Sequence, residues 1–212
     1  MDDRLEEYIL RNIEGEPDNL KRLNRRVHTQ LLYSRMCSGH LQGRLLKMLT
    51  RMINPLRVLE IGTYAGYSAL CIAEGLLRDG ATVDTIEIED ELEDFIHDGF
   101  ADSPYGDRIR LHIGDALQIV PTLGGGWDMV FIDANKRHYT DYYNAVIEQV
   151  VPGGFVIADN TLWDGKVTHP ESHNDAQTRG ILDFNELVAH DPRVETVIIP
   201  LRDGLTIIRK EL

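Results

Sequence analysis

The sequence predicts an α/β fold in which a mostly parallel, seven-stranded sheet ends in an antiparallel hairpin. From residue 57 onward, apolar runs of strand length alternate with segments of helical spacing, which is typical of a parallel sheet with helices on both faces. Near the end, Arg202-Asp203-Gly204 separates two apolar runs, and Asp-Gly in this position is a hairpin signal. The 212 residues contain no linker or repeat, so we expect one domain over residues 1–212.

The segment before the first strand is expected to be a helical N-terminal extension, residues 1–53. Residues 2–12 and 18–34 have helical patterns, and Glu16-Pro17-Asp18 breaks the chain between them. Residues 39–53 carry apolar side chains at helical spacing. These helices supply more apolar faces than one sheet needs, so some should pack on a partner chain.

The rest of the chain is expected to alternate strands and helices up to the final hairpin. Asp79-Gly80 stops the first of these helices, and Gly153-Gly154 leads into the fifth strand. The expected elements are strand 57–61, helix 66–78, strand 82–88, helix 90–101, strand 108–113, a short helix from Asp115, strand 127–133, helix 138–150, strand 155–159, helix 176–190, and strands 194–200 and 205–210.

The amino-acid composition and the net charge weigh against nucleic-acid-binding, membrane and secreted proteins. A net charge of −13 weighs against a tightly held nucleic acid, because nucleic-acid binders usually carry basic patches. No apolar stretch approaches the roughly 20 residues of a membrane span, so no membrane partner is expected. Cys37 and Cys71 cannot form a disulfide framework, and the acidic N-terminus is unlike a signal peptide, so we expect a cytoplasmic protein.

Polar residues gather where the predicted strands end. In open α/β sheets, ligands bind at the carboxyl ends of the strands. Five successive strands end in acids, amides or glycines, which chance explains poorly. These residues are Glu60 to Gly62, Glu87, Gly114 to Ala116, Asp133 to Lys136, and Asp159-Asn160.

The turn after the first strand, Glu60 to Gly66, indicates a cofactor that carries no phosphate. A dinucleotide fingerprint would need a second glycine at position 64, which Tyr64 occupies. The Glu60 carboxylate would repel a pyrophosphate, whereas it suits the cationic amino-acid end of S-adenosylmethionine. Backbone amides between Gly62 and Ser68 can bind the carboxylate of that cofactor.

Glu87 and Gly114-Asp115-Ala116 follow the next two strands and extend this interpretation. A carboxylate at Glu87 can accept hydrogen bonds from both ribose hydroxyls, and residues 114–116 are placed to meet the adenine. The alternative is a structural glycine turn with surface acids. The matching positions of the three motifs favour the cofactor site.

Asp133, Asp159 and Asn160 predict a divalent cation. They follow two strands that should be neighbours, and two carboxylates with an amide oxygen suit Mg²⁺ or Ca²⁺ better than zinc. Taken singly, Asp159-Asn160 is explained as a turn and Asp133 as a helix cap. Taken together, beside a cofactor site, the three residues favour a metal.

Lys136 follows Asp133 by about one helical turn and is a candidate general base. A divalent cation and a sulfonium nearby would lower the pKa of this lysine, because each disfavours its charged form. A neutral lysine can accept the proton of a substrate hydroxyl. The alternative is a surface lysine, but the position beside a proposed metal ligand favours the catalytic role.

Long motifs of the chain resemble one known family. They include MCSGHLQGRLL (36–46), LEIGTYAGYSAL (59–70), FIDANKRHYTDYY (131–143), DNTLWDGKV (159–167) and PLRDGLTI (200–207). The chain resembles the cation-dependent O-methyltransferases of the caffeoyl-CoA and catechol type. The resemblance implies a Rossmann-like class I methyltransferase fold, a homodimer, S-adenosylmethionine and a divalent cation, which would be Mg²⁺ or else Mn²⁺ or Ca²⁺.

The resemblance also implies roles for individual residues. The cation would be held by Asp133, Asp159 and Asn160, the base would be Lys136, the substrate would contact Trp163 and Asp164, and the cofactor would be lined by Met36, Ser38, Glu60, Gly62, Ser68, Glu87, Asp115, Ala116 and Asp133. The chain departs from the family at Asn135, where a carboxylate is usual, and at Leu182, where an arginine is common. These departures and the loop 168–174 leave the natural substrate open.

The sequence therefore predicts an S-adenosylmethionine-dependent and divalent-cation-dependent O-methyltransferase that acts on a small aromatic vicinal diol. The runner-up is a tRNA hydroxyuridine O-methyltransferase on the same scaffold. It would need a local basic groove, which a dimer can build from Arg22, Arg25, Arg26 and Arg35. A third alternative, a cofactor-binding module without catalysis, is disfavoured by the intact metal and base residues.

Overall fold

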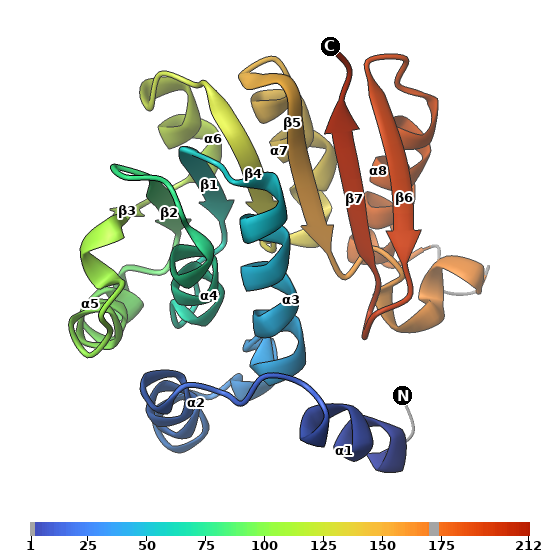
Figure 1. Ribbon diagram of the computed structural model, residues 1–212. Coiled ribbons are helices and arrows are strands. Elements are labelled where there is room, and N and C mark those ends of the chain that lie inside the picture. Colours follow the sequence, from blue (N-terminus) through green and yellow to red (C-terminus); the bar gives the residue numbers. More distant parts are fainter. Residues whose placement is uncertain (1–2, 170–173) are drawn as a thin grey trace.

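The computed structural model describes residues 3–169 and 174–212, and one seven-stranded sheet organises them. The strand order is β3-β2-β1-β4-β5-β7-β6 (Figure 1). β1 to β5 run parallel, whereas β7 is antiparallel to both β5 and β6. The predicted fold class is confirmed. The strands are β1 (Arg57–Ile61), β2 (Thr82–Glu87), β3 (Ile109–Ile113), β4 (Trp127–Ile132), β5 (Val150–Asp159), β6 (Val194–Ile199) and β7 (Leu205–Lys210).

Helices cover both faces of this sheet. α3, α4 and α5 pack on one face, and α6, α7 and α8 pack on the other (Figure 1). Each layer forms its own apolar core with the sheet, one around Leu46 and Leu70 and the other around Tyr143 and Phe184. The helices are α1 (Asp3–Arg11), α2 (Asp18–Gln30), α3 (Gly39–Ile53), α4 (Tyr67–Gly75), α5 (Glu93–Ala101), α6 (Ala116–Ile119), α7 (Tyr139–Ile147) and α8 (Ala176–His190).

The N-terminal extension lies at the carboxyl ends of the parallel strands, with α1 and α2 below the sheet in Figure 1. Glu14, between these two helices, accepts hydrogen bonds from Lys47 Nζ at 2.6 Å and from Arg44 Nη1 at 3.4 Å. Both cations also pair with the buried Glu74 of α4. This network attaches the extension to α3 and α4, and so covers the edge where the predicted site residues lie.

Helix α2 is shorter than the sequence predicts. It ends at Gln30 instead of residue 34, and a single 3₁₀ turn, Ser34–Met36, follows. Residues 30–33 and 35–38 line a cavity at the strand ends. The chain leaves the helix at Leu31, whose backbone is extended, and runs along the cavity although its residue pattern has helical spacing.

Strand β5 starts at Val150 instead of residue 155, and α7 ends at Ile147 instead of residue 150. Pro152-Gly153-Gly154 lies inside the strand, where the pairing of β5 with β4 shifts its register. A strand irregularity of this kind accommodates proline and glycine. The same residues therefore indicate a turn in the sequence and form a strand in the fold.

The loop 168–174, whose effect on the substrate the sequence leaves open, is only partly described, because residues 170–173 lie outside the described residues. Within the described ranges, no helix has both the length and the apolar character needed to cross a membrane. Cys37 and Cys71 are both buried and free. The cytoplasmic location stays a prediction.

Candidate active site

A cavity of about 1120 Å³ opens at the carboxyl ends of β1, β2, β4 and β5. A cavity at this edge of an open α/β sheet is typical of a ligand site. It brings together every predicted site residue except Glu60 and Asp164. The predicted residues that line it are Met36, Ser38, Gly62, Ser68, Glu87, Asp115, Ala116, Asp133, Lys136, Asp159, Asn160 and Trp163.

Gly62 allows two strand ends to meet in the wall of this cavity. Its φ of +99° favours glycine, and a Cβ atom added there would lie 2.0 Å from the Asp133 carbonyl oxygen. The Gly62 amide donates to Ile86 O at 3.0 Å, and the Asp133 amide donates to Ile61 O at 2.9 Å. The close approach of β1 and β4 thus requires a glycine at this position.

Glu87 ends β2 with its buried side chain at the cavity wall. Its Oε2 accepts a hydrogen bond from the Tyr64 amide at 2.6 Å, and its Oε1 accepts from the amides of Ile88 and Glu89 at 2.9 and 3.0 Å. The backbone donors fix the carboxylate, whose oxygens keep lone pairs for a ligand hydroxyl. This geometry suits the ribose contact, which stays a prediction.

Glu60 lies behind the cavity wall and does not line the cavity, and its predicted contact with the cofactor stays a prediction. The side chain is 0% exposed; its Oε2 accepts from Thr85 Oγ1, and its Oε1 has no partner among the described residues. Thr63 and Ser68 line the cavity instead. Side chains alternate along a strand, so Glu60 shares a face with Val58 beneath α4 and does not reach past the strand end.

Burial raises the pKa of Glu60 to about 8, and the charges of Asp133 and Glu87 add to the rise. The folded protein therefore keeps a proton on Glu60 at pH values where the unfolded chain, with a pKa near 4.5, has lost it. The contribution of this proton to the free energy of unfolding is fully present below pH 4.5. It is lost as the pH rises to about 8.

We expect Glu60→Gln, which does not titrate, to match the wild type in stability near pH 5. At pH 8 the variant should be more stable by about 2–4 kcal/mol, since one pKa unit corresponds to about 1.4 kcal/mol. Urea unfolding of both proteins from pH 5 to 8 measures the difference. Parallel stability curves would mean that Glu60 does not change its protonation on folding.

Lys136 stands in a 3₁₀ turn, Lys136–His138, between β4 and α7. Its Nζ donates to Asp133 Oδ1 at 2.7 Å and to the Tyr139 hydroxyl at 2.8 Å. That hydroxyl in turn donates to the Asp159 carbonyl oxygen at 3.0 Å. An ammonium carries three donors, so one position of Nζ is left for a ligand in the cavity.

The protein's own groups raise the pKa of Lys136 on balance, so the predicted lowering depends on the divalent cation and the sulfonium and stays a prediction. Burial lowers this pKa. The Asp133 carboxylate and Tyr139 raise it by more than burial lowers it, so the net shift is upward. The prediction included two cations and left out the ion pair with Asp133. A cation that neutralises Asp133 would weaken this upward shift and so favour the neutral form of Lys136.

Asp159 ends β5 and Asn160 follows it, next to the end of β4. Asp159 Oδ1 accepts from the Asn160 amide at 2.8 Å, and Oδ2 accepts from Gln42 Nε2 at 2.6 Å. Burial and the neighbouring charge of Asp133 raise the pKa of Asp159. Two neighbouring carboxylates repel each other when both are ionised, and a bound divalent cation would offset this repulsion.

The set of Asp133, Asp159 and Asn160 fits a hard cation through its oxygen atoms, although it is sparse. Carboxylate and amide oxygens are the donors that Mg²⁺ prefers. Within residues 3–169 and 174–212, no group of three or more His, Cys, Asp or Glu side chains could hold a metal ion. A cation held by this set would complete its coordination with water or substrate oxygens.

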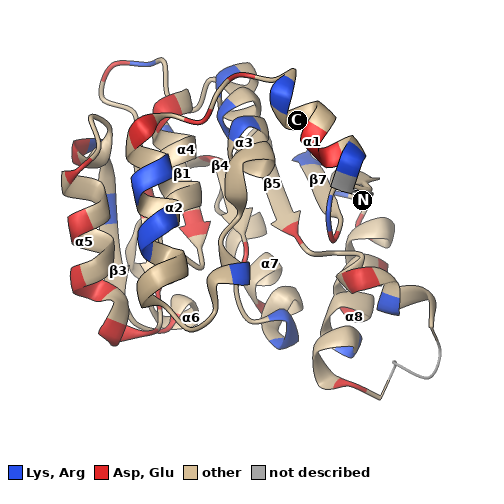
Figure 2. Cartoon of the chain, turned by 90° about the horizontal axis from the view of Figure 1, so that it is seen from below, with Lys and Arg blue, Asp and Glu red and all other residues tan. Residues whose placement is uncertain are grey.

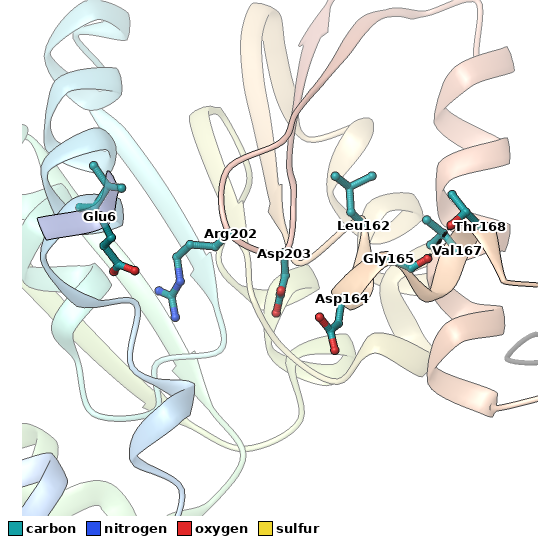
Figure 3. A pocket seen from close by; sticks show the side chains of 9 residues that line it. Glu6, Leu162, Asp164, Gly165, Val167, Thr168, Arg202 and Asp203 are labelled. Atoms are coloured by element: carbon teal, nitrogen blue, oxygen red, sulfur yellow. Dashed lines mark hydrogen bonds between the residues drawn. The ribbon is translucent and has the colours of Figure 1, made fainter. Parts of the chain in front are cut away.

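The two predicted substrate residues lie in different cavities. Trp163 lines the main cavity, whereas Asp164 lines a second cavity of about 570 Å³ (Figure 3). Arg202 and Asp203 line both cavities, which therefore adjoin at the β6–β7 turn. Trp163 and Asp164 have left-handed backbone conformations, with φ of +47° and +53°, and successive side chains then point in different directions. Both substrate contacts stay predictions, with Trp163 in the main cavity and Asp164 in the adjoining one.

Three residues of this site were not identified from the sequence. Tyr139 lies one helical turn after Lys136, so its spacing was a usable signal. Gln42 and Arg202 are far from Asp159 in the sequence, and no local pattern indicates that they meet there. Of the two departures from the family motif, Asn135 caps the turn that carries Lys136 by accepting from the Arg137 amide.

The sequence matches known O-methyltransferases over almost its full length. The O-methyltransferase family model matches residues 11–211. Caffeoyl-CoA O-methyltransferase of Eucalyptus gunnii is 33% identical over 223 residues, which cover 98% of this chain and 88% of the relative. Caffeoyl-CoA O-methyltransferase 5 of Nicotiana tabacum is 32% identical and covers 98% and 91% in the same way.

Solved structures agree with this relationship. The O-methyltransferase TomG from Streptomyces achromogenes, determined in complex with SAM, superimposes with a TM-score of 0.91 at 29% identity and covers 99% of this chain and 96% of its own. An SAH-bound methyltransferase of Podospora anserina gives a TM-score of 0.91 at 30% identity, with 99% and 95% coverage. The chain therefore belongs to the O-methyltransferase family and is an enzyme that transfers a methyl group to oxygen.

Proposed function

We propose that this enzyme transfers the methyl group of S-adenosylmethionine to one hydroxyl of a small aromatic vicinal diol, with a divalent cation and with Lys136 as general base. The observation that carries the proposal is the position of Lys136, Asp133 and Asp159 in one cavity with Glu87. The names of the plant relatives and the SAM in the Streptomyces structure support the same assignment.

The chain's residues divide the work of this reaction between cofactor, cation and proton. Glu87 would bind the ribose of the cofactor. Asp133, Asp159 and Asn160 would hold the cation, which supplies a Lewis acid that acidifies the diol when bound. Lys136 takes the proton of the reacting hydroxyl from its fixed place beside Asp133. Charge is neutralised as the methyl group moves, so the protein contributes mainly the orientation of the reactants.

A panel of acceptors tests this function. We expect methyl transfer from S-adenosylmethionine to catechols, free or as caffeoyl-CoA, and no transfer to the matched phenols with a single hydroxyl. The second oxygen matters because a cation held by Asp133, Asp159 and Asn160 would acidify a hydroxyl best when a neighbouring oxygen also binds it. Mass spectrometry of the methylated product measures the transfer to the catechols and to the single-hydroxyl phenols. Equal methylation of monophenols, or methylation of hydroxylated tRNA in preference to every catechol, would contradict the proposal.

The runner-up function, tRNA hydroxyuridine methylation, gains no support from the charge distribution. Of the arginines that a basic groove would use, Arg22 pairs with Asp102 at 2.8 Å and Arg26 pairs with Asp98 at 3.3 Å. Figure 2 shows the basic positions of α2 beside the acidic positions of α5. Arginines whose charge is balanced in this way attract phosphates less strongly.

We propose a homodimer as the working form. Exposed apolar side chains stand on α1, α3 and β6, and no described helix covers the face of β6 and β7 opposite α8 (Figure 1). These side chains include Leu5, Tyr8, Met48, Met52 and Val197. A symmetric contact would remove such a surface from water. Light scattering at micromolar concentration should give a dimer, and the monomer mass of 24.1 kDa would contradict it.

A further inference from the structure

A bridge of two side chains, Gln42 and Arg202, holds Asp159. Gln42 Nε2 donates to Asp159 Oδ2 at 2.6 Å, and Arg202 Nη1 donates to Gln42 Oε1 at 3.0 Å. Gln42 and Asp159 are 2% and 4% exposed. Asp159 and Arg202 line the main cavity and Gln42 does not, so Gln42 contacts Asp159 from behind the cavity wall.

The Gln42 amide can take only one orientation in this bridge. A guanidinium only donates hydrogen bonds and an ionised carboxylate only accepts them, so the amide oxygen must face Arg202 and the amide nitrogen must face Asp159. The other oxygen of Asp159 accepts from the Asn160 amide. Both oxygens of the carboxylate are therefore fixed, and their remaining lone pairs have a defined direction.

Arg202 connects the bridge to the rest of the site. It occupies a left-handed position in the β6–β7 turn, with φ of +49°, and also donates to the Ser38 carbonyl oxygen beside the first residue of α3. The next residue of the turn, Asp203, accepts at its carbonyl oxygen from the amides of Leu162 at 2.7 Å and Trp163 at 3.2 Å. One turn thus holds both the start of α3 and the loop after Asn160. Figure 3 shows Arg202 extending from this turn at the edge of the second cavity.

We propose that Gln42 and Arg202 are positioning residues that preset the Asp159 carboxylate for a divalent cation. This inference rests on the cation of the proposed function and adds two residues that act on Asp159 through hydrogen bonds. The hydrogen bond from Gln42 satisfies one oxygen of a buried carboxylate and restricts its rotation. Loss of such an outer partner usually weakens metal binding by roughly 10–100-fold.

Gln42→Met tests the bridge, because methionine keeps the length of the side chain and removes both polar ends. The Kd of Mn²⁺ for the full chain saturated with S-adenosylhomocysteine, measured from the paramagnetic resonance of free Mn²⁺, should rise roughly 10–100-fold. The affinity for S-adenosylhomocysteine in EDTA, measured by calorimetry, should change less than about twofold, because Gln42 does not line the cavity. Gln118→Met, at an exposed position of α6, is the matched control.

Arg202→Gly tests the same bridge from an exposed position whose backbone conformation suits glycine. The Kd of Mn²⁺ should rise by roughly 3–10-fold. The double variant should bind Mn²⁺ about as weakly as Gln42→Met alone, since Arg202 acts through Gln42. Additive effects in the double variant would contradict that action. If Gln42→Met does not fold, an unchanged Kd in Arg202→Gly overturns the proposal.

The wild type separates failure of the bridge from failure of the cation. A wild type that binds no Mn²⁺ and methylates catechols in EDTA would overturn the cation dependence and the bridge together. A wild type that binds Mn²⁺, with a folded Gln42→Met variant that binds it within about twofold, would overturn the bridge alone.

Discussion

Replacing Lys136 with alanine should lower the turnover of a catechol by roughly 10²–10⁴-fold, the usual scale for a positioned general base. Lys136 Nζ is fixed by Asp133 and Tyr139 and faces the cavity, so its loss removes the proton acceptor without opening the fold. The affinity for S-adenosylhomocysteine should barely change, because Lys136 is assigned no contact with the cofactor. Steady-state rates over a pH series, together with calorimetry, measure both effects.

Two variants make this result specific to the base. Lys136→Arg should not restore activity, because a guanidinium stays protonated and cannot accept the proton. Lys21→Ala, at an exposed position of α2, is the matched control and should leave turnover unchanged. If Lys136→Ala turns over within about threefold of the wild type across the pH series, the cation alone carries the deprotonation and the lysine is a bystander.

Removal of divalent cations with EDTA should abolish catechol methylation, and excess Mg²⁺ should restore it. Asp133 and Asp159 are two acidic side chains at adjoining strand ends, and the ion pair of Asp133 with Lys136 raises the pKa of the lysine, a shift that a cation bound to Asp133 would weaken. On the proposed mechanism the cation would therefore have two roles, to acidify the diol and to favour the neutral form of Lys136.

The control for the chelator is cofactor binding. S-adenosylhomocysteine should still bind in EDTA, because Glu87 and the glycine turn are held by protein hydrogen bonds alone. Asp159→Ala should behave like chelated wild type, with cofactor bound and no recovery by moderate Mg²⁺. Full activity in EDTA would remove the cation from the mechanism.

The sequence by itself predicted the sheet and most of the site for a local reason. Strand and helix periodicities, and signals such as Asp203-Gly204, act over a few residues, so they locate β1 to β7 without knowledge of the fold. The carboxyl ends of parallel strands meet at one edge, so residues that follow different strands, such as Glu87 and Asp159, gather there once the strands pair.

Only the tertiary structure decided how each side chain is used. Whether Glu60 reaches the cavity depends on its depth in β1, where it is fully buried, whereas Thr63 and Ser68 line the cavity. The pKa of Lys136 depends on Asp133 at 2.7 Å, a distance that spacing in the sequence does not give.

The two residues linked to Asp159 by hydrogen bonds show most clearly what local sequence patterns cannot predict. Gln42 belongs to α3 and Arg202 to the last hairpin, and no period or motif connects either residue to β5. Local patterns determined which elements form, because propensity and turn chemistry act between near neighbours. Packing determined burial, charge and orientation at the site, because these depend on contacts between segments that the sequence keeps far apart.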